Sequence, residues 1–338
     1  MLNKFCVKPV PTQREICTLS VVVPVCNEAE VLPIFHGRLV AVLGASAIDG
    51  GWELIYVDDG STDATGLILK ELQTVEAAVG VVRLSRNFGK EAAMSAGLRL
   101  TRGKAVVVID ADLQDPPELI PDMLNAWRQG ADVVNLRRRS RGGETWLKKM
   151  TARLFYRIIN RLSEVAIPEN VGDFRLLSRR VVETLNQFPE RNRFMKGLFA
   201  WVGYAQVTLD YDRQPRAAGK TKWRYRKLWN FALEGITSFS IAPLKLATYA
   251  GFVSAAAAFL YALNFLIRTL TVGEPVRGFP TLIVTILLLG GMQLMATGIL
   301  GEYMGRLFME SKRRPLYLID DYRPATLSAL QTPSGKLG

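Results

Sequence analysis

Ala105-Val106-Val107-Val108-Ile109-Asp110-Ala111-Asp112-Leu113-Gln114-Asp115 is the most informative segment of the chain, because an apolar run ends there in closely spaced acids. The valine-rich part has the composition of a buried strand. Residues two apart at a strand end point to the same side, so Asp110 and Asp112 can approach one cation. Carboxylate oxygens suit Mg²⁺ or Mn²⁺, which usually share their remaining positions with phosphates and water. An Asp-x-Asp triplet is common by chance, and its position after a strand is what favours a metal site.

Other apolar runs repeat this pattern of a strand that ends in polar residues. They lie at 19–25, 53–57, 81–84 and 131–134, and helical-length segments at 30–43, 62–73 and 91–101 separate them. Strands that alternate with helices predict an α/β domain with a mainly parallel sheet and helices on both faces. Ligands of such sheets bind beyond the carboxyl ends of the strands, so the polar clusters should converge in one crevice.

A second acidic cluster, Asp58-Asp59-Gly60-Ser61-Thr62-Asp63, follows another expected strand. One interpretation is a turn that leads into a helix, with Ser61 or Thr62 as the N-cap. Two adjacent acids also repel each other unless they meet donors, and a nucleobase edge and a ribose supply such donors. Asn27-Glu28 after the first strand is a similar but weaker signal.

Two groups of cations follow expected strands and are candidates for binding phosphate. Arg86 and Lys90 stand in the polar segment at 84–90, and Arg138 lies in an arginine triplet at 137–139. Each can form charge-assisted hydrogen bonds to phosphate oxygens. The alternative for both is an ordinary solvated loop.

Two long uncharged runs stand near the end of the chain, at 246–267 and 278–301. Each exceeds the ~20 residues needed to cross a bilayer as a helix. The alternative, a pair of buried core helices, is less favoured because core helices rarely stay uncharged for so long. The loop between the runs is short, so the sequence predicts a two-helix transmembrane hairpin at about 246–267 and 279–301.

Basic residues flank this hairpin. The segment 213–227 holds seven of the cations that give the chain its net charge of +12, and it contains no acid. The positive-inside rule places both chain ends and the front domain in the cytoplasm. The segments 146–162 and 228–239 have amphipathic helical patterns and are either interfacial or ordinary packed helices.

The basic run lies beside a membrane span, so a phosphate-bearing lipid is a better partner for it than nucleic acid. No helix-turn-helix, zinc-finger or RNA-binding signature accompanies it. The three cysteines form no CxxC pair, and only one histidine exists to join them, which argues against a zinc site.

Taken together, these motifs resemble family 2 glycosyltransferases of the polyprenyl-phosphate branch. Within that branch the chain is most similar to bacterial bactoprenol (undecaprenyl-phosphate) glucosyltransferases that feed O-antigen modification of lipopolysaccharide, and more distantly to dolichol-phosphate mannose synthases. The resemblance covers about residues 18–315, which include the two-span hairpin. Its matching strings are 24–28, 57–63, 86–91, 110–118, 172–176 and 216–223, that is PVCNE, VDDGSTD, RNFGKE, DADLQDPPE, GDFRL and RAAGKTKW.

The resemblance implies a GT-A-type fold and inverting transfer of a hexose, with UDP-glucose as the first guess for the donor. It implies a homotetramer as one possible assembly, and a location in the bacterial cytoplasmic membrane. It also implies roles for particular side chains. Those for the metal are Asp110, Asp112 and Gln114; those for the nucleotide are Pro24, Asn27, Glu28, Asp58, Asp59, Lys90 and Asp110; those for the lipid phosphate are Arg138, Arg216, Lys220 and Lys222.

Asp112, Asp173 and Arg175 are the candidate catalytic residues. The expected acceptor is a phosphate monoester whose second pKa is about 6, so it is already ionised at cytoplasmic pH. A strong general base is therefore less necessary than for a hydroxyl acceptor. We expect Asp173 to orient Arg175 or the acceptor instead of removing a proton.

The expected organisation has five parts: an N-terminal extension at 1–17, a catalytic domain at 18–212, a basic interfacial region at 213–243, the two spans within 244–304, and a tail at 305–338. A processive polysaccharide synthase would need more spans and a Gln-x-x-Arg-Trp element, which the sequence lacks. A non-catalytic scaffold would be expected to lose Asp110 or Asp112, and both are present. A nucleic-acid-binding protein would explain the charge but not the spans.

Overall fold

The computed structural model of the protein describes residues 17–139, 171–190, 193, 195–211, 242–272 and 278–326. These residues belong to two compact units, one formed by those up to 211 together with 315–326, and the other by those from 242 to 314. The predictions for Arg216, Lys220 and Lys222 and for both amphipathic segments lie outside the described residues.

The first unit is built on an eight-stranded sheet with the order β7-β5-β6-β4-β1-β2-β3-β8. The pairs β1–β2, β1–β4, β2–β3 and β5–β7 are parallel, whereas β6 is antiparallel to β4 and β5, and β8 is antiparallel to β3. The predicted α/β fold with a mostly parallel sheet is thus confirmed. The strands are β1 Leu19–Val25, β2 Trp52–Asp58, β3 Val79–Leu84, β4 Ala105–Val108, β5 Val133–Arg138, β6 Val171–Ser178, β7 Gln206–Tyr211 and β8 Ile319–Arg323.

Helices cover both faces of the central strands. Alternate residues of β1, such as Val21, share one core with Phe35 of α1, Leu69 of α2 and Met123 of α4. Helix α3 packs on the opposite face of β1 and β2, where a Cβ on Gly97 would lie 2.3 Å from Val22 Cγ1. The described helices of this unit are α1 Leu32–Ala45, α2 Thr65–Val75, α3 Lys90–Leu100, the 3₁₀ turn η1 Pro117–Leu119, α4 Ile120–Arg128, α6 Arg179–Gln187 and α7 Met195–Trp201.

The strands that the sequence predicts are present, with small shifts at their ends. The fifth begins at Val133 and runs on to Arg138, so Arg137 and Arg138 lie within β5 and not in a loop after it. The sequence does not predict β6, β7 or β8. Their charged and exposed residues hide the strand pattern, as in the run Ile319–Arg323, where two of the five residues are acids.

The last strand corrects the expectation of a tail at 305–338, because β8 completes the sheet edge beside β3. Tyr322 pairs with Val82, and the Ser85 amide donates to the Leu318 carbonyl at 2.9 Å. Beyond the strand, the Arg102 guanidinium donates to the Ala325 carbonyl at 2.9 Å. These contacts hold the segment that follows the apolar helices on the sheet.

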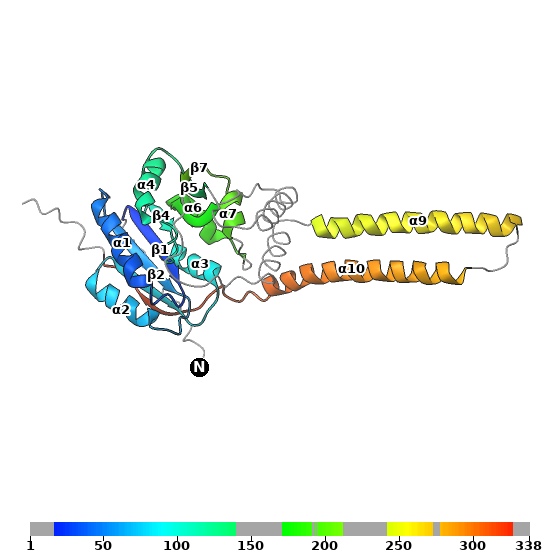
Figure 1. Cartoon of the computed structure of the whole chain (residues 1–338), viewed down its shortest axis with the longest axis horizontal. Helices are drawn as coiled ribbons and strands as arrows, with labels where there is room; N and C mark the ends of the chain where they lie inside the picture. Colours follow the sequence, from blue (N-terminus) through cyan, green and yellow to red (C-terminus); the bar gives the residue numbers. More distant parts are fainter. Residues whose placement is uncertain are drawn as a thin grey trace, which may run out of the picture. The chain divides into compact units, whose positions relative to one another are not determined.

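The second unit contains two long helices, α9 Ala242–Val272 and α10 Phe279–Ser311, which run beside each other (Figure 1). The Ser254 hydroxyl of α9 lies 3.2 Å from Met292 Sδ of α10. One helix of the described residues, over Val284–Ser311, is long and apolar enough to cross a membrane by length and composition. The apolar run at 246–267 lies within α9, and its crossing as the second arm of a hairpin stays a prediction.

Candidate active site

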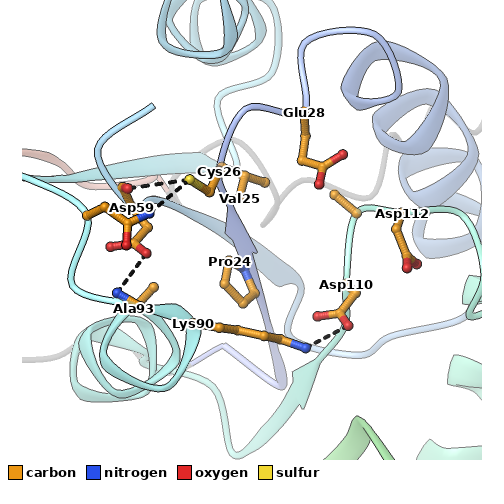
Figure 2. A pocket seen from close by; sticks show the side chains of 12 residues that line it. Pro24, Val25, Cys26, Glu28, Asp59, Lys90, Ala93, Asp110 and Asp112 are labelled. Atoms are coloured by element: carbon orange, nitrogen blue, oxygen red, sulfur yellow. Dashed lines mark hydrogen bonds and ion pairs between the residues drawn. The ribbon is translucent and has the colours of Figure 1, made fainter. Parts of the chain in front are cut away.

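A pocket of about 380 Å³ lies at the carboxyl ends of β1 and β4, beside the start of α3. In Figure 2, Asp59 lies at one end of this pocket, and Asp110 and Asp112 lie at the other. The convergence of the polar clusters that the sequence predicts is therefore observed. The lining residues are Pro24, Val25, Cys26, Glu28, Asp59, Asn87, Gly89, Lys90, Ala93, Asp110, Ala111 and Asp112.

Lys90 crosses the pocket and joins two carboxylates. Its ammonium donates to Asp110 Oδ2 at 2.7 Å and also forms an ion pair with Asp173 (Figure 2 draws the first contact). Burial lowers the pKa of Lys90, but the two carboxylates outweigh burial and raise that pKa above its usual value. Lys90 therefore stays protonated beside these acids.

The acidic turn after β4 is shaped by Leu113, whose φ of 59° is in the left-handed region. Such a conformation costs about 1 kcal/mol or more in a residue with a side chain, and it is concentrated at functional sites. In this turn the backbone amide of Gln114 donates to Asp112 Oδ1 at 3.1 Å. Gln114 itself is 6 % exposed and lies outside the pocket lining, whereas Asp112 lines it.

The two acids at the end of β2, Asp58 and Asp59, have different surroundings. Both oxygens of Asp59 accept backbone hydrogen bonds, from Phe88 at 2.7 Å and from Gly89 at 2.9 Å. Burial raises the pKa of Asp59, and these hydrogen bonds partly offset that effect. Asp58 accepts from the Ser61 amide at 2.9 Å and lines a second, smaller pocket beside α2. Neighbouring residues of a strand point to opposite faces, which explains the division.

The protein itself supplies donors to these acids. The sequence predicts a nucleobase and a ribose as these donors, but the backbone amides of Ser61, Phe88 and Gly89 already fill that place, so the pair of acids alone does not require a nucleoside. Asp59 lines the main pocket. Asp58 does not share that pocket.

Hydrogen bonds join the loop after β1 to the loop after β2. Asn27, with a left-handed φ of 56°, accepts from the Thr62 amide at 2.8 Å, and its own amide donates to Ser61 Oγ at 3.0 Å. The expectation that Ser61 or Thr62 caps the next helix is therefore wrong. Helix α2 begins later, at Thr65, and Asp63 Oδ1 accepts from the Thr65 amide at 3.0 Å.

Arg175 lies on β6 and does not line the pocket. It is 2 % exposed, donates to the Gly172 carbonyl at 2.7 Å, and stacks with its guanidinium carbon 3.9 Å from the centre of the Phe199 ring. Burial lowers the pKa of Arg175 to about 10. Asp173, which we expected to orient Arg175 or the acceptor, pairs with Lys90.

A buried network that sequence reasoning missed supports Arg138. The Tyr211 hydroxyl donates to Asp115 Oδ1 at 2.5 Å, and Arg138 Nε donates to the same hydroxyl oxygen at 3.3 Å. Burial, followed by the charge of Asp115, raises the pKa of Tyr211 to about 12. A Cβ on Gly172 would lie 3.2 Å from Arg138 Nη2, so the glycine leaves room for the guanidinium.

The charges around the acidic end favour a divalent cation. Acids outnumber cations there, because the carboxyl groups of Asp110, Asp112, Asp115 and Asp173 lie near Lys90 and Arg138. Within the described ranges no group of three or more His, Cys, Asp or Glu side chains can hold a metal ion by itself. Mg²⁺ needs only one or two carboxylates when a phosphate supplies further oxygens. The donor set therefore fits such an ion in the company of a diphosphate.

Comparison with known proteins identifies the family to which the chain belongs. The family model "Glycosyl transferase family 2" matches residues 20–185. A protein of Synechocystis named an uncharacterized glycosyltransferase is 51 % identical over 303 residues, which cover 90 % of this chain and 95 % of the relative. The bactoprenol glucosyl transferase of Shigella phage SfV is 48 % identical over 301 residues, which cover 89 % of this chain and 97 % of the relative.

Among solved structures, the mannosyl-3-phosphoglycerate synthase of Rubrobacter xylanophilus is a more distant match. It has 21 % identity and a TM-score of 0.45 over 64 % of this chain and 71 % of its own. The sequence identity to the curated relatives extends over nearly their whole length. The chain therefore belongs to glycosyl transferase family 2 and is a glycosyltransferase.

Proposed function

We propose that this glycosyltransferase moves a hexose, with glucose as the first choice, from UDP-glucose to undecaprenyl phosphate with inversion. The observation that carries the proposal is the 46–48 % identity, over 89 % of the chain, to proteins named bactoprenol glucosyl transferase or a homologue of it. The pocket supports it, because carboxylates and a lysine meet where a parallel sheet binds its ligands.

On the donor side, Pro24, Glu28 and Asp59 frame the nucleotide. Asn27 joins the loop that carries Glu28 to the loop after β2. Asp110 and Asp112 would hold Mg²⁺ or Mn²⁺, which, when bound, neutralises charge on the leaving diphosphate. Lys90 stands where its ammonium reaches both the acids and the pocket. The assignments of Gln114 to the metal and of Asp58 to the nucleotide stay predictions.

On the acceptor side, the phosphate needs cations more than a base. Its second pKa of about 6 leaves it ionised at cytoplasmic pH. Arg138, half-buried and held by Tyr211, faces the acidic end from β5 and is suited to this phosphate. Asp173 acts by holding Lys90 and not as a proton acceptor. The buried Arg175 supports the strand that carries Asp173.

The lipid acceptor cannot leave the membrane, so the enzyme must work at its surface. Exposed apolar side chains are found on both long helices, with Phe252 75 % and Leu294 76 % exposed. A bilayer is the solvent that suits such surfaces. In the proposal α9 and α10 cross the bacterial cytoplasmic membrane as a hairpin, and Arg216, Lys220 and Lys222 recruit anionic lipid on the cytoplasmic side.

The test uses purified full-length protein with undecaprenyl phosphate, Mg²⁺ and separate radiolabelled nucleotide sugars, followed by lipid extraction. We expect label from UDP-glucose in the lipid phase, and far less when dolichyl or undecaprenyl alcohol replaces the phosphate. If a different sugar is transferred, the choice of glucose is wrong. If no nucleotide sugar labels the lipid, the acceptor is wrong.

A further inference from the structure

The ammonium of Lys90 lies between carboxylates that come from different elements. Lys90 is the first residue of α3, Asp110 follows β4, and Asp173 lies on β6. The ammonium contacts both acids, at 2.7 Å in the case of Asp110. A cation of the protein therefore already lies beside an acid that the proposed function gives to a divalent ion.

This ion pair is accessible from the pocket. The side chains of Lys90 and Asp110 are 41 % and 23 % exposed, and both line the pocket. A lysine has a long, rotatable stem, so its ammonium can turn to another partner without a change in the backbone. The pair is thus placed for exchange and is not locked in the core.

We infer that Lys90 is an internal counter-cation that competes with the divalent ion for Asp110 and turns to the donor diphosphate when both bind. The inference rests on the proposed function, because it takes the acidic end of the pocket as the metal site. Two cations on one carboxylate repel each other, so a metal ion that binds alone must displace the ammonium. A diphosphate offers the ammonium new oxygens, so the nucleotide removes this competition.

The consequence is thermodynamic coupling between metal and nucleotide. If UDP gives Lys90 another partner, UDP tightens metal binding, and by linkage the metal tightens UDP binding by the same factor. Lys90 is then a positioning residue with opposite effects on two ligands. It weakens the binding of metal alone and strengthens the binding of the nucleotide.

The test measures Mn²⁺ binding to the full-length protein in detergent by electron paramagnetic resonance, with and without UDP. Lys90→Met keeps the aliphatic stem and removes the ammonium. We expect this variant to bind Mn²⁺ more tightly than wild type without UDP, by about 5-fold or more, and we expect UDP to tighten that binding by a smaller factor than in wild type. Its affinity for UDP should fall. Asp112→Asn sets the baseline of Mn²⁺ bound elsewhere.

Controls separate this role from a general loss of structure. Lys90→Met takes the ammonium away from Asp110 and Asp173 at once. The double variant Lys90→Met/Asp173→Asn, compared with Asp173→Asn alone, therefore repeats the test with one carboxylate fewer. Arg99→Met removes the same charge from the same helix, but from the last turn of α3 and not from its start. Arg99→Met should change Mn²⁺ affinity less than 2-fold, whereas the double variant should show the tighter binding.

The outcomes distinguish the inference from the function on which it rests. If wild type binds Mn²⁺ with UDP, and Lys90→Met binds Mn²⁺ alone equally or more weakly, the exchange is wrong and the metal site stands. If wild type binds no Mn²⁺ above the Asp112→Asn baseline even with UDP, the metal site itself is wrong. Tighter binding in Lys90→Met, with weaker UDP binding, supports the exchange.

Discussion

At the scale of single residues, the acidic end of the pocket combines two neighbouring acids with a pairing between distant parts of the chain. Asp110 and Asp112 are predicted because a strand end fixes both on one side, and both line the pocket. The pairing of Tyr211 with Asp115 joins positions 96 residues apart and leaves no local pattern. This pairing therefore appears only when the sheet is assembled.

Tyr211→Phe tests whether this network positions Arg138. The change keeps the ring and removes the hydroxyl that joins Asp115 to Arg138. We expect the KM for undecaprenyl phosphate to rise up to about 10-fold, because one hydrogen bond to a charged group contributes ~1.5 kcal/mol. The KM for UDP-glucose should stay within 2-fold of wild type.

Tyr204→Phe is the matched control, because its hydroxyl lies 2.9 Å from Thr184 Oγ1 of helix α6 and neither residue lines the pocket. This control should leave both KM values unchanged. A loss of kcat alone in Tyr211→Phe, with both KM values constant, would argue against a role in acceptor binding.

Asp132 gives a prediction for pH. Hydrogen bonds from Arg180, together with Ser178, lower the pKa of Asp132 below its usual value. A carboxyl with a lowered folded pKa stabilises the fold above its unfolded pKa of about 3.9, and this stabilisation is lost as the pH falls through the folded pKa.

We therefore expect Asp132→Asn to lower the Tm by about 2–4 °C at pH 7. Below pH ~4 the difference in Tm between the variant and wild type should shrink as the pH falls. Thermal unfolding in detergent at several pH values measures this difference. A gap in Tm that stays constant down to pH ~3 would show that the charge of Asp132 does not contribute.

At the scale of elements, hydrophobic pattern predicts the central strands and fails at the edges. Three of the first four expected strands, those in β1, β2 and β4, are buried on both faces, and apolar residues dominate their sequences. The third, in β3, is also mainly apolar although Arg83 is exposed. β8 has an exposed, acidic sequence and gains its conformation from pairing with β3. β6 carries Asp173 and Arg175, whose charges conceal a strand that is otherwise buried.

Gly97→Ala tests the close contact that positions α3 and, with it, Lys90. The added Cβ would lie 2.3 Å from Val22 Cγ1 and 3.0 Å from Val57 Cγ2, so the helix must move away from the sheet. We expect a loss of about 1–3 kcal/mol in the free energy of unfolding. Gly44→Ala in α1 is the control, because nothing lies within 4 Å of its added Cβ, and it should be neutral or slightly stabilising. Equal stability of the two variants would contradict the packing argument.

Removal of 319–338 tests whether β8 protects the sheet. Without β8 the backbone groups of β3 become an exposed edge, which favours aggregation. We expect a lower Tm and loss of the monodisperse peak in size-exclusion chromatography. Removal of 327–338 leaves β8 in place and sets the baseline, and identical behaviour of the two truncations would show that the strand is dispensable.

At the scale of the whole molecule, the chain joins a sheet with an acidic pocket to long apolar helices. The chain returns from those helices to the sheet through β8, so the sheet contains strands from both sides of the apolar segment. Under the proposed function this arrangement raises the local concentration of a lipid acceptor at the pocket. The sequence predicts both parts, since each has a strong pattern, but the return to the sheet depends on pairing between distant segments.

The most direct test of the proposal measures lipid-extractable label from UDP-glucose and undecaprenyl phosphate, for wild type and for Asp112→Ala, with Mg²⁺ or with excess chelator. Removal of the carboxylate or of the metal should lower the rate by about 10²-fold or more, because each takes away stabilisation of the leaving diphosphate. Wild-type rates in the presence of chelator, or in Asp112→Ala, would contradict a transfer that depends on a carboxylate-held ion.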